Sequence, residues 1–266
     1  MAQISSAEFA QFQRFIYETA GINLSDSKKA LVCGRLGRRL QACEVDTFGE
    51  YFDLLMNGES PVELQNAIDL LTTNETYFFR EPKHFEHLRA EATAAAPGRA
   101  FRVWSAAGST GEEAYSIAML LADVLPGRPW EVLCSDISTR VLARARTAHY
   151  RSERLQNLPR EYLNRFCLMG HGPQEGTFLI ERRLRERVGF MQVNLNLPLP
   201  QIGLFDVIFL RNVLIYFDRE TKRKVVEHVL QKLRPEGLLI VGHSESLIDI
   251  TREVNMLAPS VFRKPK

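Results

Sequence analysis

The sequence predicts an α/β protein in which a doubly wound, Rossmann-like sheet domain follows a helical domain and carries a small antiparallel β-subdomain. Residues 1–73 show helix-start signals and no strand pattern, whereas apolar strands and helices alternate along most of residues 74–266. Such alternation is typical of a parallel sheet covered by helices. A glycine-rich stretch interrupts it, and we expect the β-subdomain there, at about residues 167–190.

Each helix of the first domain has a start signal. Ser5 with Glu8 forms a capping box, Thr47 caps a third helix, and Ser60-Pro61 with Glu63 opens a fourth. Ser25 or Asp26 is expected to cap the second helix. We therefore expect four helices before the sheet domain begins.

The second helix has an apolar side and a basic side. Val32, Leu36 and Leu40 repeat every four residues and form one stripe. Between Ser27 and Cys43 there is no acidic residue, but there are five basic ones: Lys28, Lys29, Arg35, Arg38 and Arg39. We expect this basic side to contact an acidic partner; a solvated face is the alternative.

The sheet domain is expected to open with a helix after Glu81-Pro82. Strands are expected at residues 101–107, 130–135, 205–210 and 238–241, and helices at 112–125, 138–148 and 219–233. Pro235-Glu236-Gly237 predicts a turn before the last strand. Within the β-subdomain, Phe178-Leu179-Ile180 and Val188-Gly189-Phe190 flank a charged stretch and are expected to be antiparallel.

Composition excludes several classes of protein. The 266 residues are 45% hydrophobic with a net charge of +2, which gives no indication of a nucleic-acid partner. No apolar run approaches the roughly 20 residues of a membrane span, and residues 1–9 do not resemble a signal peptide. We expect a cytoplasmic monomer without direct membrane insertion.

Cysteine and histidine spacing indicates no metal site. The four cysteines form no Cys-x-x-Cys pair, and we expect buried thiols at Cys33, Cys43, Cys134 and Cys167. His84 and His87 are three residues apart, but no carboxylate or third ligand stands at metal-ligand spacing beside them. Both histidines are expected to be exposed or hydrogen-bonded.

A glycine-containing turn, residues 108–111, joins the expected strand at 101–107 to a helix that begins with Glu112-Glu113. Glycine allows a ligand to approach the backbone, and the helix N-terminus offers free N–H groups. The turn does not have the Gly-x-Gly-x-x-Gly pattern, and two carboxylates would repel a pyrophosphate. A sulfonium cofactor with an ammonium group fits these charges better.

Further polar residues follow expected strands, at the edge where a parallel sheet binds ligands. Asp136 ends the second strand, where a carboxylate can accept hydrogen bonds from both hydroxyls of a ribose; the alternative is a helix cap. Arg211-Asn212 follows the strand at 205–210, and the polar stretch 72–80 joins the two domains. The alternative for Arg211 is a surface salt bridge, and the alternative for the stretch 72–80 is an ordinary linker between the domains.

Taken together, these segments resemble the CheR-type chemotaxis receptor methyltransferases. The resemblance covers nearly the whole chain, and four motifs match in order and spacing: TTNETYFFR (72–80), SAAGSTGEEAYSIA (105–118), CSDIS (134–138) and FDVIFLRNVLIYF (205–217). The resemblance implies an enzyme that transfers a methyl group from S-adenosyl-L-methionine to glutamate side chains of chemotaxis receptors, leaving S-adenosyl-L-homocysteine. It also implies a helical domain at 1–73 and a methyltransferase domain at 74–266.

The resemblance further implies which residues contact the cofactor: Asn74, Thr76, Arg80, Gly108, Glu113, Asp136, Asn194, Leu195, Arg211 and Asn212. The Asn-Leu dipeptide repeats at 196–197, so Asn194-Leu195 has an alternative two residues later. Ala114 replaces the proline usual in relatives, which is dispensable in a first helical turn.

Receptor contacts are implied at two places. The basic side of the second helix, with Lys28, Arg35, Arg38 and Arg39, is expected to meet the receptor helical bundle. Gly170, Gly172 and Gly176 resemble the loop of relatives that bind a peptide at the receptor C-terminus. An ordinary glycine-rich hairpin is the alternative for this loop.

Methylation of a carboxylate requires no general base, because glutamate ionises near about pH 4.3. We expect Arg80 to hold a carboxylate, of the cofactor's methionine part or of the substrate glutamate, by paired hydrogen bonds. We expect the Tyr216 hydroxyl to orient the incoming glutamate or to contact the transferring methyl group; the alternative is that Tyr216 is simply packed. Two other functions stay open. A nucleic-acid methyltransferase would need a basic surface and an Asn-Pro-Pro-Tyr type motif, and a nucleoside-binding adaptor would bind the cofactor without turnover.

Overall fold

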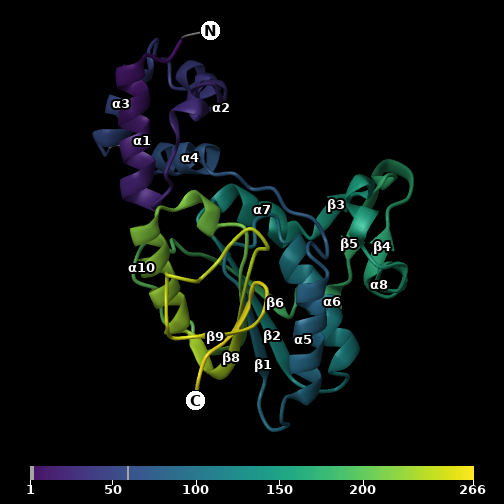
Figure 1. The fold of residues 1–266 in the computed structure, drawn as a ribbon. Helices are drawn as coiled ribbons and strands as arrows, with labels where there is room; N and C mark the ends of the chain where they lie inside the picture. The colour runs from purple at the N-terminus through teal and green to yellow at the C-terminus, as the bar shows by residue number, and fades with distance from the viewer. Residues whose placement is uncertain (1–2, 59) are drawn as a thin grey trace.

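The computed structural model describes residues 3–58 and 60–266. Four helices form a unit at one end of a larger unit built on a seven-stranded sheet, and a small three-stranded sheet projects from the side (Figure 1). None of the helices in these residues is long and apolar enough to cross a membrane. Cys134 is buried as expected, but Cys33, Cys43 and Cys167 are half-buried.

The N-terminal unit has its own apolar core, centred on Phe12, Leu36 and Tyr51. Its helices are α1 (Ser6–Ala20), α2 (Lys29–Ala42), α3 (Phe48–Met56) and α4 (Pro61–Leu71). The expected starts of α1, α3 and α4 are confirmed. The expected cap of α2 is wrong: in the described chain neither Ser25 nor Asp26 caps it, because a 3-10 turn at Asp26–Lys28 leads directly into the helix.

A buried carboxylate ties α2, α3 and α4 together. Glu63 on α4 is 5% exposed and accepts hydrogen bonds from the guanidinium of Arg39, from the Tyr51 hydroxyl (2.6 Å) and from Asn66 (3.0 Å). Burial alone would raise the pKa of Glu63, but these hydrogen bonds outweigh burial and lower the pKa to about 2. The ionised form therefore stabilises the helical unit.

We expect Glu63→Gln to destabilise the N-terminal unit by about 3 kcal/mol at neutral pH, because it leaves the guanidinium of Arg39 without its charge partner. A carboxyl group with a lowered pKa contributes stability above its unfolded value near 4.5, and this contribution is lost as the pH falls toward about 2. In thermal unfolding, the difference in stability between the wild type and the variant should therefore shrink as the pH falls through that range. Glu18→Gln, at an exposed position on α1, is the control. A difference in stability that does not change with pH would contradict the stabilising role of the ionised Glu63 carboxylate.

The main sheet has the strand order β6-β2-β1-β7-β8-β10-β9, in which the first five strands are parallel and β10 is antiparallel to both neighbours. Its strands are β1 (Phe101–Ser105), β2 (Trp130–Asp136), β6 (Val188–Gln192), β7 (Phe205–Leu210), β8 (Leu233–Val241), β9 (Asn255–Ala258) and β10 (Val261–Arg263). The expected turn at 235–237 lies inside β8, where the pairing with β7 shifts register.

Helices cover both faces of this sheet, as Figure 1 shows. On one face lie α5 (Lys83–Ala94) and α6 (Glu112–Val124), and on the other lies α10 (Arg219–Leu230). Neighbouring residues of β1 enter different cores, since Val103 packs with α6 and Trp104 packs with α10. This two-sided burial explains the apolar runs in the sequence.

The β-subdomain begins earlier in the chain than expected, and the prediction of about 167–190 is wrong at both ends. It is an antiparallel sheet of β3 (His149–Arg151), β5 (Thr177–Ile180) and β4 (Cys167–Met169), with a 3-10 segment (Ser152–Asn157) and α8 (Arg160–Phe166) between β3 and β4. Val188-Gly189-Phe190 belongs to β6, because Val188 is buried beside Val132 of the main sheet. The charged stretch between them forms α9 (Arg182–Arg185).

Direct contacts hold the N-terminal unit on the sheet unit. Asp69 on α4 accepts hydrogen bonds from the backbone N–H of Thr139 (3.0 Å) and Arg140 (3.0 Å), at the start of α7 (Thr139–Thr147). Ile22 forms a β-bridge with Phe217. These contacts place the helical unit over the carboxyl ends of β2 and β7, where a parallel sheet binds ligands.

Candidate active site

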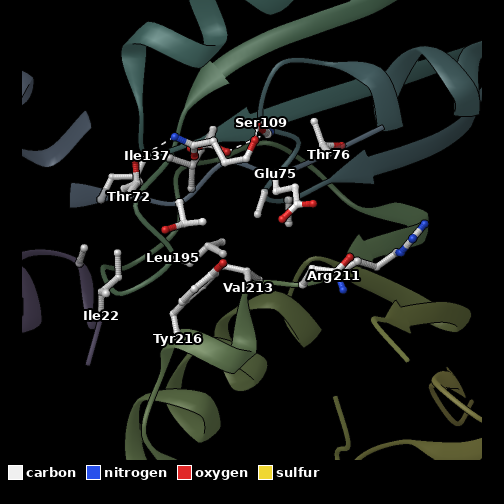
Figure 2. A pocket seen from close by; sticks show the side chains of 18 of the residues that line it. Ile22, Thr72, Glu75, Thr76, Ser109, Ile137, Leu195, Arg211, Val213 and Tyr216 are labelled. Carbon is white, nitrogen blue, oxygen red and sulfur yellow. Dashed lines mark hydrogen bonds between the residues drawn. The ribbon is translucent and has the colours of Figure 1, made fainter. Parts of the chain in front are cut away.

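A cavity that is partly open to solvent lies between the carboxyl ends of the parallel strands and the N-terminal unit (Figure 2). The structure brings ten of the expected site residues together in its wall: Asn74, Thr76, Arg80, Glu113, Asp136, Asn194, Leu195, Arg211, Asn212 and Tyr216. Asn196 and Leu197, the alternative dipeptide, do not line it. Apolar side chains with a few polar and charged groups among them are typical of the wall of a ligand pocket.

Gly108 lies behind the cavity wall instead of in it. A Cβ atom at this position would lie 2.3 Å from the sulfur of Cys134 and 2.7 Å from the hydroxyl of Ser105, so only glycine lets the turn pack against β2. Gly111 has a left-handed φ of 94° and starts α6. The two glycines therefore shape the turn that carries Ser109 into the cavity.

Asp136 lies at the tip of β2 with its carboxylate at the cavity. The carboxylate accepts hydrogen bonds from the backbone N–H groups of Ser109 (3.0 Å) and Ser138 (2.9 Å). Ser138, and not Asp136, caps α7 in the described chain, so the helix-cap alternative is wrong. Burial raises the pKa of Asp136 to about 6, although the hydrogen bonds from Ser109 and Ser138 act to lower it. The group is ionised at neutral pH and keeps lone pairs for ligand hydroxyls.

Arg211 is buried at the end of β7, so the surface salt bridge considered for it is wrong. It lies 3.3 Å from a carboxylate oxygen of Glu81 and 3.4 Å from one of Glu113, and it donates to the backbone carbonyl of Arg80 (2.5 Å). Its Nε and Nη1 have no hydrogen-bond partner among the described residues. Buried donors without a partner require an explanation, and a ligand carboxylate would satisfy them.

Glu113 completes this charged wall. It accepts a hydrogen bond from the Ser105 hydroxyl (2.6 Å), and burial raises its pKa. The charged residues that line the cavity are Glu75, Glu113 and Asp136 against Arg80 and Arg211, so the acidic side chains outnumber the basic ones and the wall favours a ligand that carries positive charge. Negative charge, arginine donors that make no hydrogen bond within the described residues, and the carboxylate of Asp136 fit a cationic amino-acid nucleoside such as S-adenosylmethionine.

Arg80 and Tyr216 approach the cavity from different elements. Arg80 donates to the backbone carbonyl of Glu75 (3.0 Å), and its guanidinium lies over the ring of Tyr77. Tyr216 is half-buried on the short 3-10 turn Leu214–Tyr216, and Figure 2 shows its ring directed toward the cavity from the side opposite Ser109 and Ile137. Burial raises the pKa of Tyr216, so its hydroxyl stays protonated at neutral pH.

Apart from Leu195, sequence reasoning missed the apolar part of the wall. Ala20 and Ile22 come from the N-terminal unit, and Ile137, Val193 and Val213 come from loops after strands. Ile137 and Val213 adjoin Asp136 and Asn212, which is a signal that the motifs contained. Ala20 and Ile22 carried no signal, because the β-bridge of Ile22 to Phe217 joins residues far apart in the chain.

The expectation for His84 is also wrong. His84 is buried at 1% exposure, and neither ring nitrogen has a hydrogen-bond partner in the part of the chain that the structure describes. Its Nδ1 lies 3.3 Å from Glu81, and its ring meets that of His243 edge to face. The fold thus brings a carboxylate and a second histidine to a residue that seemed isolated in the sequence.

A Rossmann-like sheet with a carboxylate at the tip of β2 and an anionic cavity wall defines an S-adenosylmethionine-dependent methyltransferase. Family comparison agrees: the model of the CheR methyltransferase SAM binding domain matches residues 74–262, and that of the CheR methyltransferase all-alpha domain matches residues 7–72. The chain belongs to the CheR methyltransferase family.

Relatives match over nearly the full chain. The chain is 44% identical to the chemotaxis protein methyltransferase of Salmonella typhimurium strain LT2 and 43% identical to that of Escherichia coli strain K12, each match covering 99% of this chain and 92% of the relative. Among solved structures, the N-methyltransferase NodS from Bradyrhizobium japonicum with S-adenosyl-l-homocysteine is similar at a TM-score of 0.42 and 14% identity, covering 82% of this chain and 98% of that one.

Proposed function

We propose that this protein transfers methyl groups from S-adenosylmethionine to glutamate carboxylates on the cytoplasmic helical bundle of chemotaxis receptors. The observation that carries the proposal is the convergence of Asp136, Arg211 and Tyr216 on one cavity that opens between the two units of the chain. The names of the relatives support a role in chemotaxis. The product would be a methyl ester that removes one negative charge from the receptor.

The cofactor supplies a methyl group bonded to a positively charged sulfur. In our proposal Asp136 accepts hydrogen bonds from the ribose hydroxyls, and Arg211 holds a carboxylate with its Nε and Nη1, which make no hydrogen bond within the described residues. Arg80 and Tyr216 orient the receptor glutamate, which is already ionised at neutral pH. Fixing the reacting groups in line contributes roughly 7 to 11 kcal/mol when it replaces a bimolecular encounter.

The test is an assay with methyl-labelled cofactor, receptor-containing membranes and nucleic acid offered in parallel. We expect label on the receptor that alkali releases, since esters hydrolyse in base. Binding of the cofactor without transfer to either acceptor would favour the adaptor alternative. Label on nucleic acid, and none on receptor, would favour a nucleic-acid methyltransferase.

The basic side of α2 is partly engaged within the protein. Arg35 donates to the backbone carbonyls of Leu70, Leu71 and Thr72 at the end of α4, and Arg39 pairs with Glu63. Lys28 and Arg38 are exposed. A test of receptor docking therefore has to use Lys28 and Arg38, because substitution of Arg35 or Arg39 would disturb the packing of the helices.

We expect the double charge reversal Lys28→Glu, Arg38→Glu to slow receptor methylation about tenfold at low salt and less at physiological salt, because exposed charges are screened beyond about 8 Å. Cofactor affinity, measured by calorimetry, should not change. Arg252→Glu with Lys266→Glu changes the net charge equally at exposed positions after β8 and is the control. Equal rates for both double variants would leave this face without a docking role.

The glycine loop of the β-subdomain joins two strands of its sheet. A Cβ at Gly170 would lie 2.0 Å from the carbonyl oxygen of Gln174, and Gly172 and Gly176 have left-handed φ values of 56° and 78°. The neighbouring edge strand β4 exposes Leu168 and Met169. We propose that a receptor C-terminal peptide adds to the edge of β4, with backbone hydrogen bonds providing affinity.

Accordingly, Gly170→Val should weaken binding of a receptor C-terminal peptide by at least about tenfold, because the loop that ends β4 must distort. Fluorescence anisotropy with a labelled peptide measures this. Gly127→Ala, at a left-handed glycine with open space around it, controls for backbone strain elsewhere. If no receptor tail binds the wild-type protein, the loop has a structural role only.

A further inference from the structure

Beside the cavity lies a second group of side chains whose chemistry the proposed reaction does not use. Glu81 precedes α5, His84 stands in its first turn, and His243 lies in the turn after β8; their ligand-type atoms lie within 4.8 Å of one another. The backbone of Glu81 has a left-handed φ of 58°, an uncommon conformation for glutamate. The fold holds these three residues together from two separate segments of the chain.

His84 provides an independent indication that a ligand is missing from this group. Burial of an imidazole without hydrogen bonds is costly, and both ring nitrogens of this 1% exposed side chain lack a partner in residues 3–58 and 60–266. The ring faces His243, at 4.8 Å between ring centroids, and the carboxylate of Glu81. A metal ion between the three residues would give the buried nitrogen its partner.

We propose that Glu81, His84 and His243 bind a zinc ion with one coordination position left open. Two imidazoles and a carboxylate are a ligand set found in zinc sites that keep an open position. Tetrahedral coordination at about 2.0 to 2.2 Å places ligand atoms roughly 3.3 to 3.6 Å apart. The 3.3 Å between His84 Nδ1 and Glu81 already fits, and His243 is exposed in a turn, where its side chain can rotate inward.

Charge around the group also permits a cation, despite the guanidinium of Arg211 3.3 Å from Glu81. Glu113 pairs with Arg211 from its other side, and Glu245 accepts hydrogen bonds from the backbone N–H groups of Asn212 (2.8 Å) and Gly242 (2.6 Å), next to His243. Two carboxyl groups therefore pair with the guanidinium and a third lies beside His243, so these three acidic groups outnumber the one guanidinium.

Zinc at this position would be coupled to the cavity through Glu81. The same carboxylate pairs with Arg211 and lies 3.4 Å from the amide nitrogen of Asn212, and both residues line the cavity. A zinc ion that takes this carboxylate leaves Arg211 less neutralised and adds positive charge near a cationic cofactor. We therefore expect zinc to weaken S-adenosylmethionine binding about fivefold or more, and the cofactor to weaken zinc by the same factor. This coupling rests on the proposed cofactor role of the cavity.

The experiment begins with the metal-free full chain and zinc alone, which makes it independent of the proposed function. Calorimetry should show one zinc ion that is lost in His243→Ala and retained in His171→Ala, an exposed histidine of the β-subdomain loop. Cobalt as a substitute should give visible bands without a thiolate charge-transfer band. Thermal unfolding without metal should show that His243→Ala is folded.

Zinc affinity in His243→Ala equal to that of the wild type, or a cobalt spectrum with thiolate ligation, would overturn the site. The second measurement is cofactor affinity with and without zinc, in wild type and in His243→Ala. Loss of the zinc effect in the variant supports the coupling. An unchanged cofactor affinity in zinc-loaded wild-type protein would overturn the coupling and leave both the metal site and the proposed methylation standing.

Discussion

Asp136→Ala is expected to reduce S-adenosylmethionine affinity roughly a hundredfold, the largest binding effect of any single substitution considered for this chain. A charged acceptor contributes about 1.5 to 3 kcal/mol per hydrogen bond, and the carboxylate at the tip of β2 is placed to accept two from a ribose. The carboxylate also accepts the backbone N–H groups of Ser109 and Ser138, so alanine leaves these amides without their acceptor. Calorimetry should therefore be accompanied by thermal unfolding.

Asp136→Asn separates the two roles, because it keeps an oxygen acceptor while removing the charge and one acceptor atom. We expect about a tenfold loss of affinity with a smaller change in stability. Because burial raises the pKa of Asp136 to about 6, wild-type affinity should also fall as the pH drops below about 6, and this dependence should be absent in Asp136→Asn. Unchanged affinity of Asp136→Ala at neutral pH would remove this residue from the site.

The sequence predicts the central strands well because two-sided burial makes them continuous apolar runs. Strand β7 was expected at residues 205–210 and is observed as Phe205–Leu210, with every residue buried. Strand β3, His149–Arg151, has three residues and alternates between exposed and buried, so no run marks it and the subdomain boundary was placed too late. The formation of a short strand such as β3 depends more on pairing with a neighbouring strand, here β5, than on its own sequence.

Site residues were predictable where they follow a strand and unpredictable where they depend on contacts between distant segments. Asp136 and Arg211 come directly after apolar runs, so topology alone brings them together. Ile22 reaches the cavity through its bridge to Phe217, and His84 meets His243 across more than half of the chain. The spacing of residues along the sequence does not indicate that such distant residues meet, because nothing in the sequence shows which segments lie side by side.

Substitution of Arg80 is expected to have the largest effect on turnover. If Arg80 holds a carboxylate by two charge-assisted hydrogen bonds, Arg80→Ala should lower kcat/KM by roughly a hundredfold or more. Arg80→Lys keeps the charge but loses the paired geometry, so it should recover only part of the activity. Tyr77, whose ring lies under the guanidinium and outside the cavity wall, offers Tyr77→Phe as the matched control.

Tyr216→Phe tests the other side of the reacting centre, because it removes the hydroxyl and preserves the ring that packs beside Leu214 and Phe217. A hydroxyl that orients the substrate glutamate should, when removed, lower kcat about tenfold while the cofactor affinity changes by less than about twofold. Steady-state kinetics with the receptor as the varied substrate separate kcat from KM. A packed role predicts wild-type kcat and a change in thermal stability at most. Full activity in Tyr216→Phe together with normal turnover in Arg80→Ala would place the reacting centre elsewhere in the cavity, since these two side chains come from different elements of the sheet unit and both line the cavity.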